Sequence, residues 1–324
     1  MIKLVYPKFW SKNGVLSYLL LPFSWIYILL GKVRKIFVKP VKLNSIVICV
    51  GNMSVGGTGK TQIVLWLAEL LTKKGDNFLV VTKGYGSSLK GAKIVEKTDL
   101  ASEVGDESVL LSLYAPVLAA KNIKVALPII AKLKPDIVIF DDGLQNPGFV
   151  KDLNVLVIDA NRSVGNKKIF PAGPLRETVK SALDKSDIIA MVGNDLCQDF
   201  ALINNIMSSN KPFFKAKIKL KQQLDLSKKY YAFTAIGNPD RFYELLKNQG
   251  AILGGVQSFP DHHNYTKLEI EALQIIAKEN KYCLITTKKD YVKIVKNNQI
   301  ICADVVLDID NEQKLFSLIY DKKS

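Results

Sequence analysis

The sequence of 324 residues is poor in cysteine and histidine, and this excludes several kinds of site. Cys49, Cys197, Cys283 and Cys302 lie far apart, with no CxxC pair and no spacing typical of a zinc site. Cys49 and Cys283 stand in apolar, strand-like runs, as buried thiols do. We therefore expect no disulfide framework, and a reducing compartment such as the cytoplasm suits the chain.

Signals of secretion, repetition and nucleic-acid binding are also missing. No small-residue cleavage site follows the apolar amino-terminal run, so a signal peptide is not expected. The chain has no internal repeat, no low-complexity tract, no RNP-type aromatic motif, no zinc finger and no clear helix-turn-helix. We expect no nucleic-acid partner.

Positive charge predominates, with 45 Lys and Arg against 30 Asp and Glu, a formal net charge of +15. Nucleic acid, an anionic membrane surface and a phosphorylated substrate are the partners that such charge attracts. A lysine-rich composition with no such partner explains it equally well, because the lysines are scattered and greatly outnumber the arginines. The length allows one large or two modest domains.

An almost uncharged run covers residues 15–31 and has lysines on both sides. Its length is marginal for a membrane-spanning helix, which needs about 20 apolar residues, and Pro22 interrupts it. We expect a helix that lies on the cytoplasmic leaflet, attracted by anionic headgroups; a helix packed on the protein's own core is the alternative. Aromatic residues typical of a lipid–water boundary accompany the run: Trp10, Tyr18, Trp25 and Tyr27.

The most informative stretch is residues 45–61, SIVICVGNMSVGGTGKT. A strand-like run breaks into glycines here and is followed by helical periodicity over residues 62–72. Glycines on such a turn let successive N–H groups point at an anion, and the helix adds its positive end. Lys60 can reach the β- and γ-phosphates, and the Thr61 hydroxyl can bind magnesium. The predicted nucleotide-binding residues are Ser54, Val55, Gly56, Gly57, Thr58, Gly59, Lys60 and Thr61.

One position departs from the usual phosphate-loop pattern G-x-x-x-x-G-K-[ST]. Ser54 stands where that pattern begins with glycine. A glycine-rich turn without a ligand is therefore the alternative, although the strand-to-helix context favours a nucleotide site.

Strand-like and helical segments alternate beyond this loop. Strands are expected at residues 77–82, 115–119, 136–140, 154–158 and 187–192, and helices at 107–114 and 124–133. This rhythm predicts an α/β fold with a mostly parallel sheet and helices on both faces. Residues 215–229 read as a lysine-rich ribbon or linker, followed by a smaller α/β domain that contains a last strand at 305–309. The expected parts are therefore 1–40, 41–215 and 216–324.

Charged residues follow several of these segments. Asp141 and Asp142 come directly after an apolar strand, the Walker-B arrangement that holds Mg²⁺, although a surface turn would read the same way. Gln145 could place its amide near the phosphates. Arg176 follows a rigid Pro-Ala-Gly-Pro turn, where a guanidinium suits a transferring phosphoryl group; a proline-started helix is the alternative.

Asp106 and Glu107 open a predicted helix, and capping alone would explain them. His262 and His263 are the two histidines, in a loop of the second domain. A loop histidine is by default solvated. A carboxylate and a histidine that face each other across a cleft would instead form a base for a sugar hydroxyl.

Taken together and in order, these motifs resemble the tetraacyldisaccharide 4′-kinase family, lipid A pathway enzymes that phosphorylate a membrane glycolipid. Serine or threonine at the first loop position is usual in that family, which accounts for Ser54. The matching segments run across nearly the whole chain: GNMSVGGTGKT at 51–61, KGYGS at 83–87, GDE at 105–107, DDGLQN at 141–146, NRSVGN and PAGPLRE within 161–177, and FPDHH at 259–263.

The resemblance implies a P-loop NTPase-like core and ATP-dependent phosphorylation of the 4′-hydroxyl of tetraacyldisaccharide 1-phosphate, giving lipid IVA, with Mg²⁺ as cofactor. It places the protein at the cytoplasmic face of the bacterial inner membrane, and we expect a monomer. The closest rival is a membrane-associated P-loop ATPase that acts as a switch or transport subunit and hydrolyses ATP whether or not glycolipid is present. An NTPase that binds nucleic acid is the third interpretation, and it predicts stimulation with a steep salt dependence.

The resemblance also implies roles for single residues. Asp106 is the general base and His262 orients it, while Lys60, Arg176 and Asp142 complete the catalytic set. The metal residues are Thr61, Asp141, Asp142 and Glu107, and Tyr85 and Gln145 shape the nucleotide pocket. Two positions depart from the family pattern. Asn146 stands where histidine is common, and Ile123 is nearest to a frequent arginine, with Lys121 close by.

Overall fold

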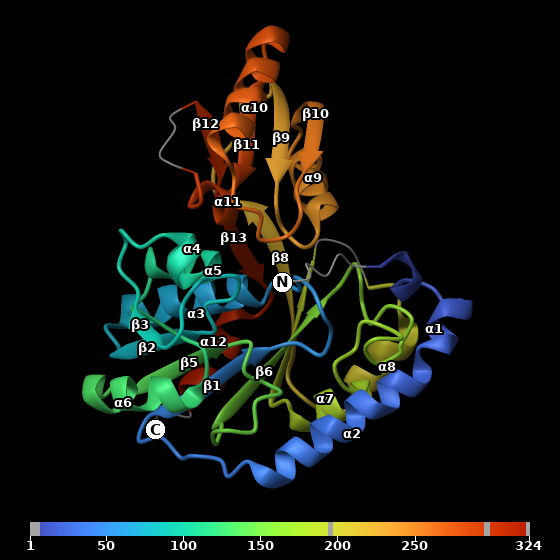
Figure 1. Ribbon diagram of the computed structural model, residues 1–324, viewed down its shortest axis with the longest axis vertical. Helices are drawn as coiled ribbons and strands as arrows, with labels where there is room; N and C mark the ends of the chain where they lie inside the picture. Colours follow the sequence, from blue (N-terminus) through green and yellow to red (C-terminus); the bar gives the residue numbers. More distant parts are fainter. Residues whose placement is uncertain (1–6, 194–196, 295–298, 322–324) are drawn as a thin grey trace.

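The computed structural model describes residues 7–193, 197–294 and 299–321. A nine-stranded sheet, called the large sheet, forms its body in the order β13-β8-β7-β6-β1-β5-β2-β4-β3 (Figure 1). Its strands are β1 (Ile46–Gly51), β2 (Phe78–Thr82), β3 (Ala92–Ile94), β4 (Val117–Ala120), β5 (Ile137–Asp141), β6 (Leu153–Asp159), β7 (Ile188–Val192), β8 (Phe213–Leu220) and β13 (Val305–Ile309). The β3–β4 and β8–β13 pairs are antiparallel and the other pairs are parallel, which confirms the predicted mostly parallel sheet.

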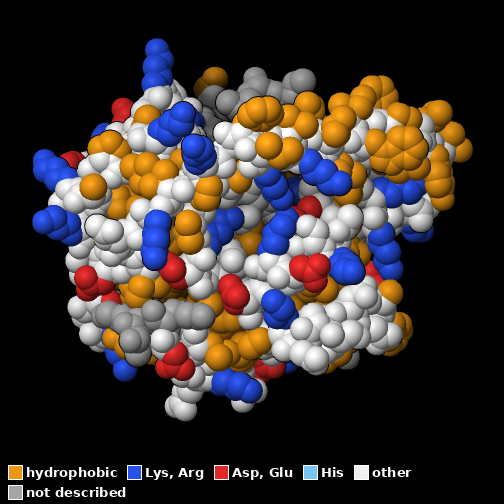
Figure 2. Space-filling model, turned by 90° about the horizontal axis from the view of Figure 1, so that it is seen from below, with side chains coloured by type: hydrophobic (Ala, Val, Ile, Leu, Met, Phe, Trp, Pro, Cys, Tyr) orange, Lys and Arg blue, Asp and Glu red, His pale blue; other side chains and the backbone are white. Residues whose placement is uncertain are grey.

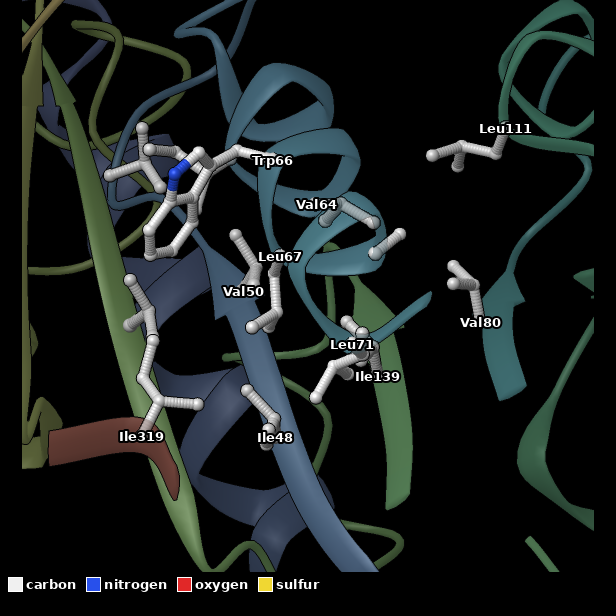
Figure 3. Packing of buried hydrophobic residues seen from close by; sticks show 14 of the residues in the cluster. Ile48, Val50, Val64, Trp66, Leu67, Leu71, Val80, Leu111, Ile139 and Ile319 are labelled. Atoms are coloured by element: carbon white, nitrogen blue, oxygen red, sulfur yellow. The ribbon is translucent and has the colours of Figure 1, made fainter. Parts of the chain in front are cut away.

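Helices cover both faces of the large sheet, as predicted. Ile48 and Val50 of β1 belong to a cluster that includes side chains of α3 (Lys60–Lys74), α5 (Asp106–Ser112) and α12 (Glu312–Tyr320) (Figure 3). The alternate residues of β1, Val47 and Cys49, pack with α6 (Ile123–Leu133) on the opposite face. Neighbouring residues of a strand point to opposite faces, so a parallel strand covered on both sides is apolar throughout.

A four-stranded parallel sheet forms a second body at one end of the molecule (Figure 1). We call the described residues of 229–303 the small unit. It contains β9 (Lys229–Thr234), β10 (Ile252–Ser258), β11 (Cys283–Thr287) and β12 (Ile300–Ala303), with α9 (Pro239–Asn248), α10 (Lys267–Asn280) and α11 (Lys288–Tyr291).

Two strands, β8 and β13, belong to the large sheet, whereas we expected a linker and a strand of the smaller domain in their places. The lysine-rich segment read as a ribbon or linker begins as β8, which pairs with β7, and Phe214 and Ala216 are buried in the large core. The strand at 305–309 exists, but it pairs with β8 and not with the small sheet, which corrects its assignment to the smaller domain. The expected boundary after residue 215 therefore lies inside β8. Burial of alternate apolar residues makes these segments strands of the large sheet.

The amino-terminal segment forms α1 (Val15–Leu19) and α2 (Leu21–Phe37), and Pro22 stands in the first turn of α2, where proline is tolerated. One side of α2 contacts the protein: Ser24 Oγ donates to the Ile169 carbonyl at 2.7 Å, and Ile28 packs against the cluster of α7 (Val179–Lys185) and α8 (Phe200–Ser208). Within the described residues, no helix is both long and apolar enough to cross a membrane.

Large apolar side chains of α1 and α2 remain exposed. Figure 2 views the end of the molecule where α2 lies and shows hydrophobic side chains gathered with Lys and Arg beside them. The most exposed belong to both helices: Val15, Leu19, Trp25, Leu29, Leu30, Ile36 and Phe37. The segment thus has one face on the protein core and one apolar face in solvent.

Candidate active site

A cavity of about 750 Å³ lies between the phosphate loop (residues 52–59) and the small unit. The carboxyl ends of parallel strands meet at one edge of a sheet, which brings their following loops to this place. The predicted site residues that line it are Val55, Gly56, Gly57, Thr58, Gly59, Lys60, Thr61, Tyr85, Glu107, Asp141, Asp142, Arg176 and His262. Asp106, Ser54 and Gln145 are not among its lining residues.

The phosphate loop has the backbone conformation that its glycines predict. Gly56 and Gly59 have φ of +109° and +91°, in a region that side chains other than glycine rarely adopt. Within the loop, Asn52 Nδ2 donates to Thr58 Oγ1 at 3.1 Å. The Val55 N–H donates to the Pro174 carbonyl at 2.7 Å, so the Pro-Ala-Gly-Pro turn supports the loop from one side.

That turn also directs Arg176 at the Walker-B carboxylate. Arg176 Nη1 lies 2.8 and 3.0 Å from the two oxygens of Asp142, and Lys60 Nζ lies 3.7 Å from Oδ1. Lys83 Nζ, from the turn after β2, is 3.5 Å from Oδ2. Burial acts to raise the pKa of Asp142, but Lys60, Arg176 and Lys83 outweigh it and the pKa is lowered. Asp142 is therefore a carboxylate that gathers three cations at the phosphate end of the cavity.

Asp141 has the opposite environment. Burial first, and then the nearby Glu107, raise its pKa to about 7, and Oδ1 is buried without a hydrogen-bond partner among the described residues. A divalent cation would compensate both features. In the described part of the chain no three His, Cys, Asp or Glu side chains cluster as a metal site. Magnesium commonly takes one or two carboxylates and completes its shell with phosphate oxygens and water, and the predicted residues fit that pattern.

Gln145 supports the phosphate loop from behind. Its Nε2 donates to the Asn52 carbonyl at 2.7 Å, and its Oε1 accepts from Arg176 Nη1 at 3.3 Å. Its amide contacts the phosphate loop and Arg176, and its placement near the phosphates stays a prediction. Asn146 likewise turns inward, with Oδ1 accepting from the Gly148 N–H at 3.0 Å.

The end of the cavity next to the small unit brings together residues 156 positions apart. His262 Nδ1 lies 3.0 and 2.9 Å from the two oxygens of Asp106, and the rings of His262 and Tyr85 are 5.1 Å apart. Asp106 is 4% exposed. Burial acts to raise its pKa, but Lys289, His262 and Lys293 outweigh it and the pKa is lowered. Asp106 thus faces the small unit, beyond any role in capping its own helix.

His263 points away from Asp106, toward Glu269 of its own unit. Its Nε2 lies 3.0 Å from both oxygens of Glu269, and its ring stacks on Phe259 at 5.0 Å. Glu269 and Thr266 form the capping box of α10, so His263 belongs to the packing of the small unit.

Comparison with known proteins agrees with this geometry. The sequence profile described as Tetraacyldisaccharide-1-P 4′-kinase matches residues 16–323. The chain belongs to this family. Tetraacyldisaccharide 4′-kinase of Rickettsia bellii is 49% identical over 323 residues, covering 99% of this chain and all of that protein. The same enzyme of Rickettsia canadensis is 48% identical over 324 residues, covering 99% of this chain and 98% of that protein.

A solved structure gives the same result at the level of the fold. The "apo" form of LpxK from Aquifex aeolicus in complex with ATP superimposes with a TM-score of 0.76 at 29% identity. The match covers 96% of this chain and 100% of that one. The chain is thus a kinase of the tetraacyldisaccharide 4′-kinase family with a P-loop α/β fold.

Lys121 lies close to the position at Ile123 where the family pattern differs. Its Nζ donates to the Gly84 carbonyl at 2.9 Å, in the turn that carries Tyr85. Ile123 itself packs against the core cluster on the α6 face. Lys121 therefore stabilises the Tyr85 turn and does not reach the carboxylates at the phosphate loop.

Sequence reasoning missed two lysines of this kinase. Lys289 Nζ lies 3.6 Å from Asp106 Oδ2, 3.5 Å from Glu107 Oε1 and 3.7 Å from Asp261 Oδ1. Lys293 Nζ is 3.9 Å from Asp106 Oδ2 and 2.8 Å from Asp290 Oδ1. A signal was present: polar residues that follow a buried parallel strand, here β11, tend to reach the ligand edge. The same reasoning had selected Asp141.

Proposed function

We propose that this chain transfers the γ-phosphoryl group of ATP to the 4′-hydroxyl of tetraacyldisaccharide 1-phosphate, giving lipid IVA. One observation carries the proposal: the Asp106–His262 pair stands beside the same cavity as the phosphate loop. A switch ATPase has no use for a carboxylate–histidine pair beside the nucleotide. A kinase needs it to receive the proton of the acceptor hydroxyl.

At the donor end, the backbone N–H groups of residues 56–59 and Lys60 bind the β- and γ-phosphates. Arg176 is held by Asp142 close to these phosphates and stabilises the charge that develops on the transferring group. Mg²⁺, when bound by Thr61, Asp141 and Asp142 with Glu107 nearby, neutralises charge on the phosphate oxygens. Phosphoryl transfer requires mainly positioning and electrostatic stabilisation, and these side chains supply both.

At the acceptor end, Asp106 accepts the hydroxyl proton and His262 orients its carboxylate. Because Asp106 is nearly buried, the sugar approaches it beside the His262 and Tyr85 rings, which line the cavity. The small unit supplies His262 while α5 supplies Asp106. The base is complete only when both bodies meet.

The exposed apolar face of α1 and α2 would keep the protein at the membrane that contains the lipid substrate. We propose that this face lies in the cytoplasmic leaflet of the inner membrane, with the neighbouring lysines at the headgroups. The acyl chains then stay in the bilayer while the sugar enters the cavity. The site residues named above all belong to one chain, so a monomer can act alone.

The test is direct transfer of label. Purified full-length protein is incubated with γ-labelled ATP, Mg²⁺ and the tetraacylated disaccharide monophosphate in mixed micelles. We expect label in the lipid, and an Asp106→Asn variant that transfers it far more slowly. Glycolipid-independent release of phosphate with no labelled lipid would favour the switch or transport ATPase. Stimulation by RNA or DNA would favour the nucleic-acid interpretation.

A further inference from the structure

Lys289 occupies the junction of the two bodies at the acceptor end. It is the second residue of α11, in the small unit, and its side chain is 18% exposed. Its ammonium lies 3.5–3.7 Å from three carboxylates, two of which (Asp106 and Glu107) begin α5 of the body with the large sheet. The third, Asp261, precedes His262 in the small unit. One cation is therefore shared by three anions from two bodies.

The neighbouring lysines have other partners. Lys288 Nζ lies 2.6 Å from Asp304 Oδ2 and contacts the Tyr114 hydroxyl, on the other side of α11. Lys293 is 2% exposed and lies 2.8 Å from Asp290 Oδ1, much closer than its 3.9 Å to Asp106. Lys289 is thus the lysine of this segment whose charge is directed at the acceptor carboxylates.

Three carboxylates in one place repel each other unless a cation lies between them. The repulsion here would act across the junction, because Asp261 and His262 are on the small unit while Asp106 and Glu107 are on α5. Without the ammonium, this repulsion would favour a movement of α5 away from the loop of Asp261. That movement would separate His262 from Asp106, the contact on which the acceptor base depends.

We propose that Lys289 is a positioning residue for phosphoryl transfer: by joining Asp106 and Glu107 to Asp261, it holds the acceptor base against His262. The inference rests on the proposed kinase function. It adds a residue that acts through Asp106, in the same contact network, and that need not touch ATP or the sugar. A side chain that holds another group in place affects turnover more than nucleotide binding.

The test compares Lys289→Met, which keeps the length and removes the charge, with Lys289→Arg, which keeps the charge. In the labelled-lipid assay with full-length protein, we expect Lys289→Met to lower kcat by roughly 10- to 100-fold while KM for Mg·ATP stays within about twofold. Lys289→Arg should recover most of the lost kcat. Lys219→Met is the matched control, because Lys219 pairs with Asp308 on the exposed surface of β8 and β13.

A double variant shows whether Lys289 acts through Asp106. In an Asp106→Asn background, the Lys289→Met substitution should change kcat little further, because the group it positions has lost its function. Wild-type kcat in Lys289→Met, a loss confined to KM for ATP, or additive effects in the double variant would each overturn the proposal. No labelled lipid from wild-type protein would instead overturn the proposed function.

Removing one partner of a buried ion pair can prevent folding. Circular dichroism and a thermal melt are therefore measured for every variant. If Lys289→Met does not fold, Lys289→Gln replaces it in the same comparison, and the same slow turnover is expected. If neither neutral variant folds, the kcat of Lys289→Arg alone tests the proposal. A kcat below about one hundredth of the wild-type value then overturns it.

Discussion

His262 Nδ1 lies 2.9 Å from Asp106 Oδ2. A loop of the small unit therefore contacts a carboxylate of the body that contains the large sheet. The neighbouring His263 contacts Glu269 of its own unit. The two adjacent histidines therefore have different partners and should have different functions.

Substitution of each histidine by glutamine separates these functions. We expect His262→Gln to lower kcat by about 10²-fold or more, in the range of lost acid–base catalysis, and Asp106→Asn to lower it at least as much. His263→Gln should retain kcat within a few-fold and lower Tm, because it disturbs the packing on Phe259 and Glu269. Labelled-lipid kinetics and thermal melts provide both values. Equal loss of kcat in the two histidine variants would contradict the assignment.

The ionisation of Asp141 should make stability depend on pH in the absence of nucleotide and metal. A carboxyl in an unfolded chain has a pKa of about 3.9, whereas burial raises the pKa of folded Asp141 to about 7. Between these values the folded protein keeps a proton that the unfolded chain has lost, so this contribution to stability falls as pH rises.

An Asp141→Asn variant avoids that loss. We expect it to melt a few degrees above the wild type at pH 8, and the difference to fall to about a quarter of that value near pH 4.5. Asp184, exposed on α7, provides the control Asp184→Asn, whose melting difference should not change in this way. A constant offset between Asp141→Asn and wild type at all pH values would disprove the raised pKa.

Two glycines of the phosphate loop should respond differently to alanine. A Cβ on Gly59 would lie 2.9 Å from Val192 Cγ1, at a φ of +91°, so Gly59→Ala should lower Tm clearly. A Cβ on Gly57 has no atom within 4 Å, so Gly57→Ala should fold almost as stably as the wild type.

Gly57 lines the cavity, so the same methyl would enter the space where we propose that the phosphates bind. We therefore expect Gly57→Ala to weaken ATP binding, measured by calorimetry, with little change in its thermal melt. A Gly57→Ala protein that binds ATP normally would show that residue 57 does not approach the phosphates.

The apolar face of α1 and α2 should bind anionic lipid. Trp25 and Leu29 are 68% and 61% exposed, so the double substitution Trp25→Glu/Leu29→Glu should leave the fold intact. In sedimentation with vesicles of phosphatidylglycerol and phosphatidylethanolamine, this variant should stay in the supernatant while the wild type pellets. Leu268, 77% exposed on α10, gives the matched control Leu268→Glu, which should pellet like wild type. Equal sedimentation of both variants would refute the membrane face.

The phosphate end of the site could be predicted because its determinants are local. β1, the phosphate loop and α3 are consecutive, and a glycine turn between an apolar strand and a helix has few other uses. Asp141 and Asp142 were recognised for the same reason, since Asp141 ends β5 and Asp142 directly follows it. Motif order then identified the family, which the relatives and the solved structure confirm.

Contacts between segments distant in sequence were decided by tertiary packing. β8 and β13 join the large sheet because their alternate apolar residues are buried against its core, although lysines fill the positions between them in β8. Gln145 supports the phosphate loop because it forms hydrogen bonds with the Asn52 carbonyl and Arg176. The spacing of these residues along the chain does not predict such contacts.

The sequence by itself determined the nucleotide-binding loop, the parallel α/β alternation and the set of residues from which the site is drawn. Periodicity and turn chemistry act over a few neighbouring residues, so they can be read directly. Tertiary structure alone decided that Lys289 joins Asp106 to Asp261, because this depends on how two separately folded sheets meet. That geometry arises from burial and charge summed over both bodies, and no local pattern contains it.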